Sequence, residues 1–244
     1  MSEAKKISTK IWRPILEKLD KKVDAACLRR DAYLSKVLEI EIAMLESEVS
    51  IPNSKDALNF ISNRLDILDR KLVSLTLDSE LVDRLNAICS RKRINRDSFF
   101  NRLFLVLAAS SKLIDRLFFL NEENWRRYVW EAYKHEGPFF HNSFYPLEQE
   151  INPFWAVRCG IELCNEDELV DYTEPESGNS IRVQKSFEGN VYPSTNLYTI
   201  IFEDKELKNT DLYGLNTYIP DWQIPGHPAA STYAAGLDDL LAEL

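Results

Sequence analysis

Alternating apolar and polar residues mark two short segments of this chain, and helical periodicity follows each of them. In the second segment, residues 71–77, apolar side chains recur at every other position, which predicts a strand with one buried face. Apolar residues at spacings of three and four then predict two helices, the first starting at Asp78-Ser79 and the second capped by Asn95. The apolar positions of these helices are Leu81, Leu85, Ile88, Phe99, Phe100, Leu103, Phe104 and Leu107. This part of the chain therefore predicts a strand-helix-helix unit.

The first segment repeats the same pattern at a constant offset of 66 residues, without a gap. The aligned pairs are Ile7 with Val73, Leu19 with Leu85, Leu28 with Ile94, Arg30 with Arg96, Asp31 with Asp97, Tyr33 with Phe99 and Val37 with Leu103. Identity between the copies is low, so the evidence for a repeat is the shared order of apolar and polar classes at a fixed spacing. Two copies of one unit are predicted.

Between the copies, apolar residues at helical spacing in 54–69 predict a further helix, with Asn53-Ser54 as its cap. This gives a first copy over residues 1–49, a linker helix within 50–69 and a second copy over 70–110. The remainder, 111–244, is predicted to be a helical and α+β domain that binds a partner or effector. Its expected strands are 154–163, 181–187 and 197–202, with helices at 113–120 and 123–134.

Charge divides the chain in the same way. Residues 1–104 carry 20 Lys and Arg against 16 Asp and Glu, whereas residues 105–244 carry 10 against 23, so a net charge of -9 conceals a basic N-terminal half. The excess of positive charge lies in 1–36 and 70–104, the two copies, and the stretch between them is acidic. Two separated basic segments are typical of a surface that faces phosphate groups.

The turn between the helices of the second copy carries a family resemblance. The run from Arg93 to Phe100, RINRDSFF, resembles the G-x-S-R-S-E-L-I signature of the ribbon-helix-helix repressors of the Arc, MetJ and CopG type. Arg93 stands at the signature glycine, and Cys27 takes that place in the first copy, where Arg29 replaces the capping residue. The resemblance covers about 35 residues in each copy. It implies a mostly helical N-terminal tandem ribbon-helix-helix pseudo-dimer. Together with the α+β domain that the residue pattern predicts for the C-terminal part, the expected fold class is α+β.

In that family two paired strands enter the major groove of duplex DNA, which admits a two-stranded ribbon. Here one chain would supply both strands. The resemblance places the base-contacting side chains on the outward face, at Lys6, Ser8, Lys10, Leu72, Ser74 and Thr76. Phosphate contacts are expected near the N-termini of the second helices and at the strand end, from Arg29, Arg30, Asn95, Arg96 and Lys71. Because the two strands differ, the DNA site should be asymmetric.

Simpler interpretations compete with these assignments. Lys6 and Lys10 could be ordinary solvated residues, and a ribbon could serve assembly alone. Arg91-Lys92-Arg93 could be a solvated turn or a phosphate clamp. Leu72 is an unusual base reader, although it could contact a thymine methyl group. The aromatic and proline-rich segment 213–228 could dock on a partner or wrap its own domain, and 235–244 ends in leucines on one helical face.

Motifs for catalysis are not recognised in the sequence, so no enzymatic activity, cofactor or metal is expected. His135, His141, Cys159 and Cys164 lack a known ligand spacing. Four cysteines without a C-x-x-C pair indicate reduced thiols, and the absence of a long apolar run predicts a cytoplasmic protein that does not enter a membrane.

Two functions remain. The first is a sequence-specific DNA-binding regulator, an autorepressor or antitoxin-like protein, with a protein partner on its C-terminal domain and possible association of copies on DNA. The second is a DNA-recruiting or scaffolding subunit of a plasmid, phage or defence assembly. Antitoxins of this family usually carry one copy of the motif and a short tail, which distinguishes them from this chain.

Overall fold

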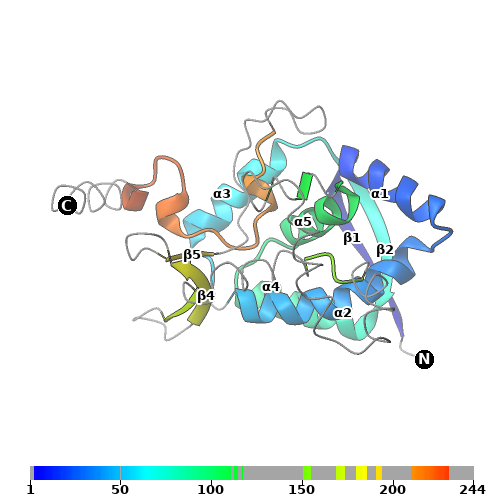
Figure 1. The fold of residues 1–244 in the computed structure, drawn as a ribbon, viewed down its shortest axis with the longest axis horizontal. Helices are drawn as coiled ribbons and strands as arrows, with labels where there is room; N and C mark the ends of the chain where they lie inside the picture. Colours follow the sequence, from blue (N-terminus) through cyan, green and yellow to red (C-terminus); the bar gives the residue numbers. More distant parts are fainter. Residues whose placement is uncertain are drawn as a thin grey trace, which may run out of the picture.

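The computed structural model describes residues 3–49, 51–110, 113, 114, 117, 151–154, 169–173, 180–185, 191–193 and 210–230. Its N-terminal part contains two strand-helix-helix units joined by a helix (Figure 1). The first unit consists of β1 (Ala4–Trp12), α1 (Arg13–Ala25) and α2 (Arg30–Glu48), and α3 (Lys55–Asp66) follows. The second unit consists of β2 (Arg70–Asp78), α4 (Ser79–Arg91) and α5 (Arg96–Ala108). The predicted order of elements is confirmed.

The two strands pair with each other in an antiparallel, two-stranded ribbon. Nine residue pairs run from Ala4 opposite Asp78 to Trp12 opposite Arg70. One face of the ribbon is buried, and the inward residues are Ile7, Thr9, Ile11, Val73, Leu75 and Leu77. Since side chains alternate across a strand, the residues between them form the opposite, outer face. The alternation in the sequence predicted these inward positions correctly.

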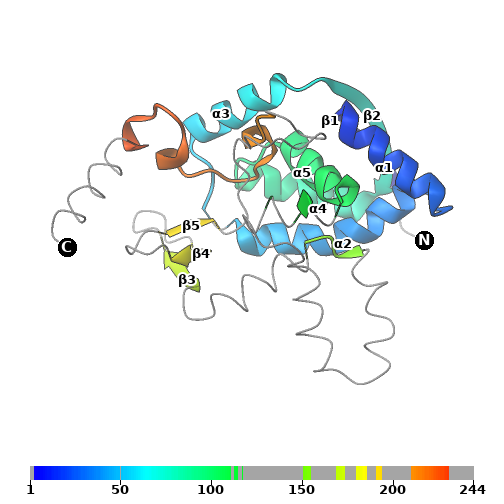
Figure 2. The ribbon, with the colours of Figure 1, turned by 45° about the horizontal axis from the view of Figure 1, so that its top comes forward.

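Each second helix packs against the strand and first helix of the other unit. α5 packs on β1 and α1, and α2 packs on β2 and α4 (Figures 1 and 2). Every residue of α5 from Ser98 to Ala108 is buried, because α3 and the C-terminal segment cover it as well. The core of the two units is therefore continuous, and neither unit encloses its apolar surface alone.

Capping residues explain where the helices begin. Asn95 accepts hydrogen bonds from the backbone N–H groups of Asp97 (2.9 Å) and Ser98 (3.3 Å). Ser54 accepts one from Ala57 N–H at 2.9 Å, and Asp78 accepts one from Glu80 N–H at 2.8 Å. Arg29 precedes α2 without a side-chain cap. The sequence predicted all four starts, including the missing cap in the first unit.

The turns that end α1 and α4 share one backbone conformation. Cys27 (φ 56°) and Arg93 (φ 50°) both adopt the left-handed conformation. Leu28 N–H donates to Val23 O (3.0 Å) and Ile94 N–H donates to Cys89 O (2.9 Å), the six-residue hydrogen bond of a glycine-type helix end. These positions differ by the repeat offset and coincide with the glycine of the signature. The equivalence of the two units extends to backbone geometry.

Replacing Cys27 with glycine should stabilise the protein. The left-handed conformation costs an L-residue about 1–2 kcal/mol, and glycine costs about 0.5–1 kcal/mol in the unfolded chain, so we expect a net gain of about 0.5 kcal/mol. Cys27 is exposed, so little packing is lost. Urea denaturation measures the change. Cys27→Ala, which keeps the backbone strain, is the control and should show no gain.

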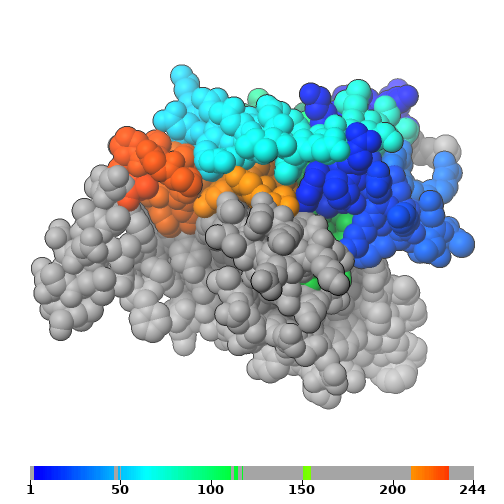
Figure 3. Space-filling model, turned by 90° about the horizontal axis from the view of Figure 1, so that it is seen from above, coloured from blue at the N-terminus to red at the C-terminus, as the bar shows by residue number. Residues whose placement is uncertain are grey.

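The segment 210–230 packs along α3 (Figure 3). Ile219 and Ile224 form a small cluster with Ala57 and Ile61, and Tyr213 contacts the ring of Phe60. Arg64 Nη1 lies 3.1 Å from Asp211 Oδ2, and Ser54 bonds to the carboxylate of Asp221. This packing corresponds to the interpretation in which 213–228 covers its own chain.

Gly214 permits this packing, because its Cα approaches the backbone of α3. A Cβ at this position would lie 2.4 Å from Leu65 N and 2.7 Å from Leu65 Cα. We expect Gly214→Ala to lower the free energy of unfolding by about 1–3 kcal/mol, as overpacking does. Thermal denaturation checks the loss. Asn59→Ala, an exposed change on α3 that adds no atom against residue 214, is the control; an equal loss in both variants would contradict the steric explanation.

Further along the chain, β3 (Leu169–Thr173), β4 (Ser180–Lys185) and β5 (Val191–Pro193) form an antiparallel sheet in the order β3-β4-β5. β4 begins one residue before the strand predicted at 181–187 and overlaps it over residues 181–185. β3 and β5 were not predicted. The helices predicted at 123–134 and 235–244 and the strand at 197–202 lie outside the described residues, as do nearly all of 113–120 and 154–163. In general terms the protein is α+β.

Candidate nucleic-acid interface

The outer face of the β1-β2 ribbon presents the six side chains predicted to contact bases. All six are exposed, and they lie opposite one another in three pairs: Lys6 with Thr76, Ser8 with Ser74, and Lys10 with Leu72. Leu72 is 65% exposed, an unusual position for a leucine on a strand. The three pairs form one continuous row of polar, cationic and apolar groups, and no described element lies between them and solvent.

The centre of this row is also the centre of the repeat. Ser8 and Ser74 are cross-strand partners and, at the same time, equivalent positions in the two units. An approximate two-fold axis therefore passes between them. It relates Lys6 to Leu72 and Lys10 to Thr76, so both lysines belong to β1 and their counterparts on β2 are uncharged. The backbone is nearly symmetric, whereas its outward chemistry is not.

Two arginines flank this centre. Arg30, the first residue of α2, donates from Nη2 to Ser74 O at 3.5 Å, and Arg96, the first residue of α5, donates from Nη2 to Ser8 O at 2.9 Å. Each second helix thus places a guanidinium group against the central residue of the other unit's strand. A helix N-terminus adds free N–H groups and partial positive charge at the same place.

The other residues predicted to contact phosphate are placed differently. Arg29 is exposed immediately before α2, whereas Asn95 is half-buried, caps α5 and donates from Nδ2 to Ser62 Oγ at 3.0 Å. Lys71 is exposed near the start of β2, opposite Ile11. The structure therefore brings Arg30, Arg96 and the ribbon together. Asn95 also has a structural role, because its side chain caps α5.

The cationic turn 91–93 is tied to the protein. Arg91 pairs with the carboxylate of Glu46, and Arg93 donates from Nη1 to Asn53 O at 3.3 Å. Lys92 donates to Glu46 O and is buried, and this burial lowers the pKa of Lys92. All three side chains have intramolecular partners, but Arg91 and Arg93 remain exposed and only Lys92 is buried, so the solvated turn and the phosphate clamp both stay predictions.

Sequence reasoning overlooked the buried Asn101 and assigned the buried Asn53 only a capping role. Asn101 accepts from Trp12 N–H at 2.7 Å and donates to Lys10 O at 2.8 Å, which fixes β1 to α5. Asn53 bonds to both the α4–α5 turn and the segment 210–230. The available signal was a polar residue within an otherwise apolar helical face, as at Asn101, because buried amides require partners.

The two described cysteines should differ strongly in reactivity. Burial raises the pKa of the Cys89 thiol to about 12, although the nearby Arg96 lowers it. We expect an alkylating reagent at pH 8 to modify the exposed Cys27 and to spare Cys89 until the protein unfolds. Because the unfolded thiol ionises near its ordinary pKa of 9.0, this thiol's contribution to stability is complete below that pH and is lost as the pH rises to about 12. Peptide mass spectrometry measures the labelling; equal rates at both thiols in the native protein would contradict the prediction.

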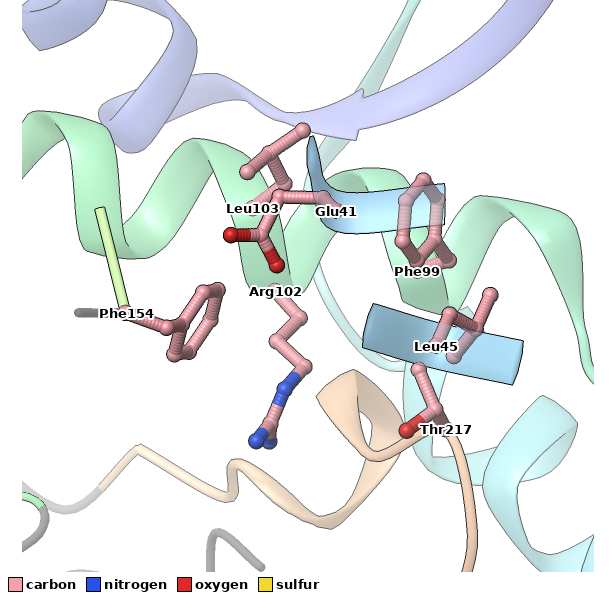
Figure 4. Close-up of a pocket in the computed structure, with 7 residues that line it drawn as sticks. All are labelled: Glu41, Leu45, Phe99, Arg102, Leu103, Phe154 and Thr217. Carbon is pink, nitrogen blue, oxygen red and sulfur yellow. The ribbon is translucent and has the colours of Figure 1, made fainter. Parts of the chain in front are cut away.

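A separate pocket lies between α2, α5 and the segment 210–230 (Figure 4). Its lining residues are Glu41, Leu45, Phe99, Arg102, Leu103, Phe154 and Thr217. Glu41 and Arg102 are both buried, and the guanidinium carbon of Arg102 lies 5.0 Å from the centre of the Phe154 ring. The pocket therefore combines a carboxylate, a guanidinium group and aromatic rings, and it shares no residue with the ribbon.

Clusters of His, Cys, Asp and Glu that could hold a metal do not occur among the described residues, and His135, His141, Cys159 and Cys164 lie outside them. None of the helices in the described part of the chain has the length and hydropathy of a membrane span. Comparisons of the chain with protein-family models, with curated proteins and with solved structures gave no match.

Proposed function

We propose that this protein is a duplex DNA-binding regulator of the ribbon-helix-helix type, in which one chain supplies both strands of the ribbon. The observation that carries the proposal is the outer face of the ribbon: six predicted base-contacting residues are exposed in three cross-strand pairs centred on Ser8 and Ser74. The size of a two-stranded ribbon matches the major groove. The shared helix ends at Cys27 and Arg93 further support a duplicated ribbon-helix-helix unit.

In this proposal the two halves of the DNA site are read by different chemistry. Lys6 and Lys10 donate to guanine O6 and N7, the serines at the centre accept or donate according to the base, and Leu72 meets a thymine methyl group. Arg30 and Arg96 contact the phosphate backbone of the DNA on both sides of the ribbon, and these contacts do not read sequence. The target is therefore an asymmetric site, although the protein backbone of the ribbon has nearly two-fold symmetry.

The C-terminal region is proposed to bind a protein partner or a small effector. For an effector, the pocket that contains Glu41 and Arg102 is the candidate site. It is lined by α2 and α5, whose N-terminal residues are Arg30 and Arg96, so a ligand there would contact the same two helices that approach the ribbon. This connection favours an effector that changes DNA affinity.

Binding of the purified protein to the DNA upstream of its own gene, compared with an unrelated duplex over a salt series, tests the proposal. A protected site that survives moderate salt would support a sequence-specific regulator. Equal, salt-sensitive binding to both duplexes would favour the DNA-recruiting subunit instead. Absence of binding to either duplex would overturn the DNA-binding function and reduce the ribbon to an assembly module.

A further inference from the structure

The arginines that flank the ribbon, Arg30 and Arg96, occupy equivalent positions but have different partners. Arg30 Nη1 lies 3.0 Å from the carboxylate of Asp20, and its Nε lies 3.3 Å from Asp31. Arg96 Nη1 instead donates to the amide oxygen of Asn86, at 3.3 Å. Asp20 and Asn86 are themselves equivalent, because they differ by the repeat offset. The two units therefore share the geometry of this arginine contact but differ in one charge, because the partner is a carboxylate in the first unit and an amide in the second.

The second acidic residue increases this difference. Asp31 and Asp97 are equivalent, but among the described ion pairs only Asp31 contacts the arginine that precedes it at the start of its helix. Asp97 accepts from Thr9 Oγ1 at 2.8 Å and lies 3.6 Å from Arg70 Nη1. Both arginines contact a backbone carbonyl of the ribbon, but the charge of Arg30 is also balanced by two carboxylates, whereas Arg96 contacts a neutral amide.

We propose that Asp20 weakens the hold of the first unit on the DNA backbone, so that the second unit, through Arg96, is the stronger phosphate contact and fixes the orientation of the protein on its site. This inference rests on the proposed DNA-binding function. A phosphate that approaches Arg30 must replace Asp20 or lie beside it, and both alternatives reduce the gain from the contact. At Arg96 the phosphate meets, among the described residues, no carboxylate in hydrogen-bonding contact with the guanidinium group. Since Arg30 and Asp20 are partly exposed, with 26% and 41% of their side chains accessible, the phosphate can reach them.

Two reciprocal substitutions test the proposal. Asp20→Asn should raise DNA affinity about fivefold at low salt, and Asn86→Asp should lower it by a similar factor, since each changes one unit charge a few ångströms from a phosphate. Asp20→Asn should also steepen the dependence of log affinity on log salt by up to about 0.9, because Arg30 then gains one full phosphate contact. Asp24→Asn, an exposed change of the same charge on the same chain segment, is the matched control and should have little effect.

The double variant Asp20→Asn/Asn86→Asp separates charge placement from net charge, which it leaves unchanged. Its affinity should stay near that of the natural protein, while the strongest ethylation interference should move from the flank contacted by Arg96 to the flank contacted by Arg30. Equal interference on both flanks in the natural protein, or equal effects of Asp20→Asn and Asp24→Asn, would overturn this inference and leave DNA binding intact. If the natural protein bound no duplex, the proposed function would fail and this inference with it.

Discussion

Replacing Lys6 and Lys10 together by alanine is expected to lower affinity for the specific DNA site roughly 30-fold while the protein stays folded. Each good base contact is worth about 1–3 kcal/mol, and lysine, which binds as a point charge, lies at the lower end, so two contacts amount to about 2 kcal/mol. Both side chains are exposed on the outer face of the ribbon, so the core is unaffected. Fluorescence anisotropy with the specific duplex measures the affinity, and thermal denaturation confirms the fold.

A control for this prediction must remove the same charge from elsewhere. Lys36 and Lys55 are exposed on α2 and α3, away from the ribbon strands, so Lys36→Ala/Lys55→Ala changes the net charge equally. This control should lose only a few-fold in affinity, through weaker general attraction to DNA. If both double variants lost the same affinity, the lysines of β1 would contribute only net charge, and base contact by the ribbon would be contradicted.

Asn53→Ala should give the largest loss of stability, about 3–5 kcal/mol, because each buried polar group left without a partner costs about 1–3 kcal/mol. Asn53 is fully buried, and its side chain serves three backbone groups. Its Nδ2 donates to Arg93 O (3.1 Å) and Thr217 O (2.8 Å), and its Oδ1 accepts from Ile219 N–H (3.2 Å). One side chain therefore joins the linker, the α4–α5 turn and the C-terminal segment.

Urea denaturation measures this loss, and hydrogen exchange locates it. Protection of the Ile219 amide should fall first, since it loses its acceptor. Asn59→Ala, an exposed change on α3, is the control and should stay within about 0.5 kcal/mol of the natural protein. A small effect at Asn53 with unchanged protection at Ile219 would show that the C-terminal segment is held by its apolar contacts alone.

Local features of the fold were accessible from the sequence because their causes are local. Alternation predicted the inward residues of both strands, and the capping roles of Ser54, Asp78 and Asn95 followed from side-chain oxygens placed before apolar helical runs. The left-handed positions 27 and 93 were found by alignment with a signature glycine, even though neither residue is glycine. Each of these inferences needs only the few residues around it.

The missed features join residues far apart in the chain. Asn53 and Thr217 are separated by 164 positions, and nothing near either residue indicates the other. Gly214 does not adopt the left-handed conformation that favours glycine. A small side chain is needed there because the backbone of α3 lies close by. The roles of Asp20 and Asn86 became visible only when Arg30 and Arg96 were seen beside the ribbon.

By itself the sequence determined the duplicated strand-helix-helix unit and the residues that face outward on its ribbon, because hydrophobic periodicity and capping act over a few residues. The tertiary structure alone decided that the two strands pair about Ser8 and Ser74, that each second helix packs on the other unit and that 210–230 covers α3. The physical reason is that burial and hydrogen-bond satisfaction are properties of the whole packed chain, which brings groups together irrespective of their separation in sequence.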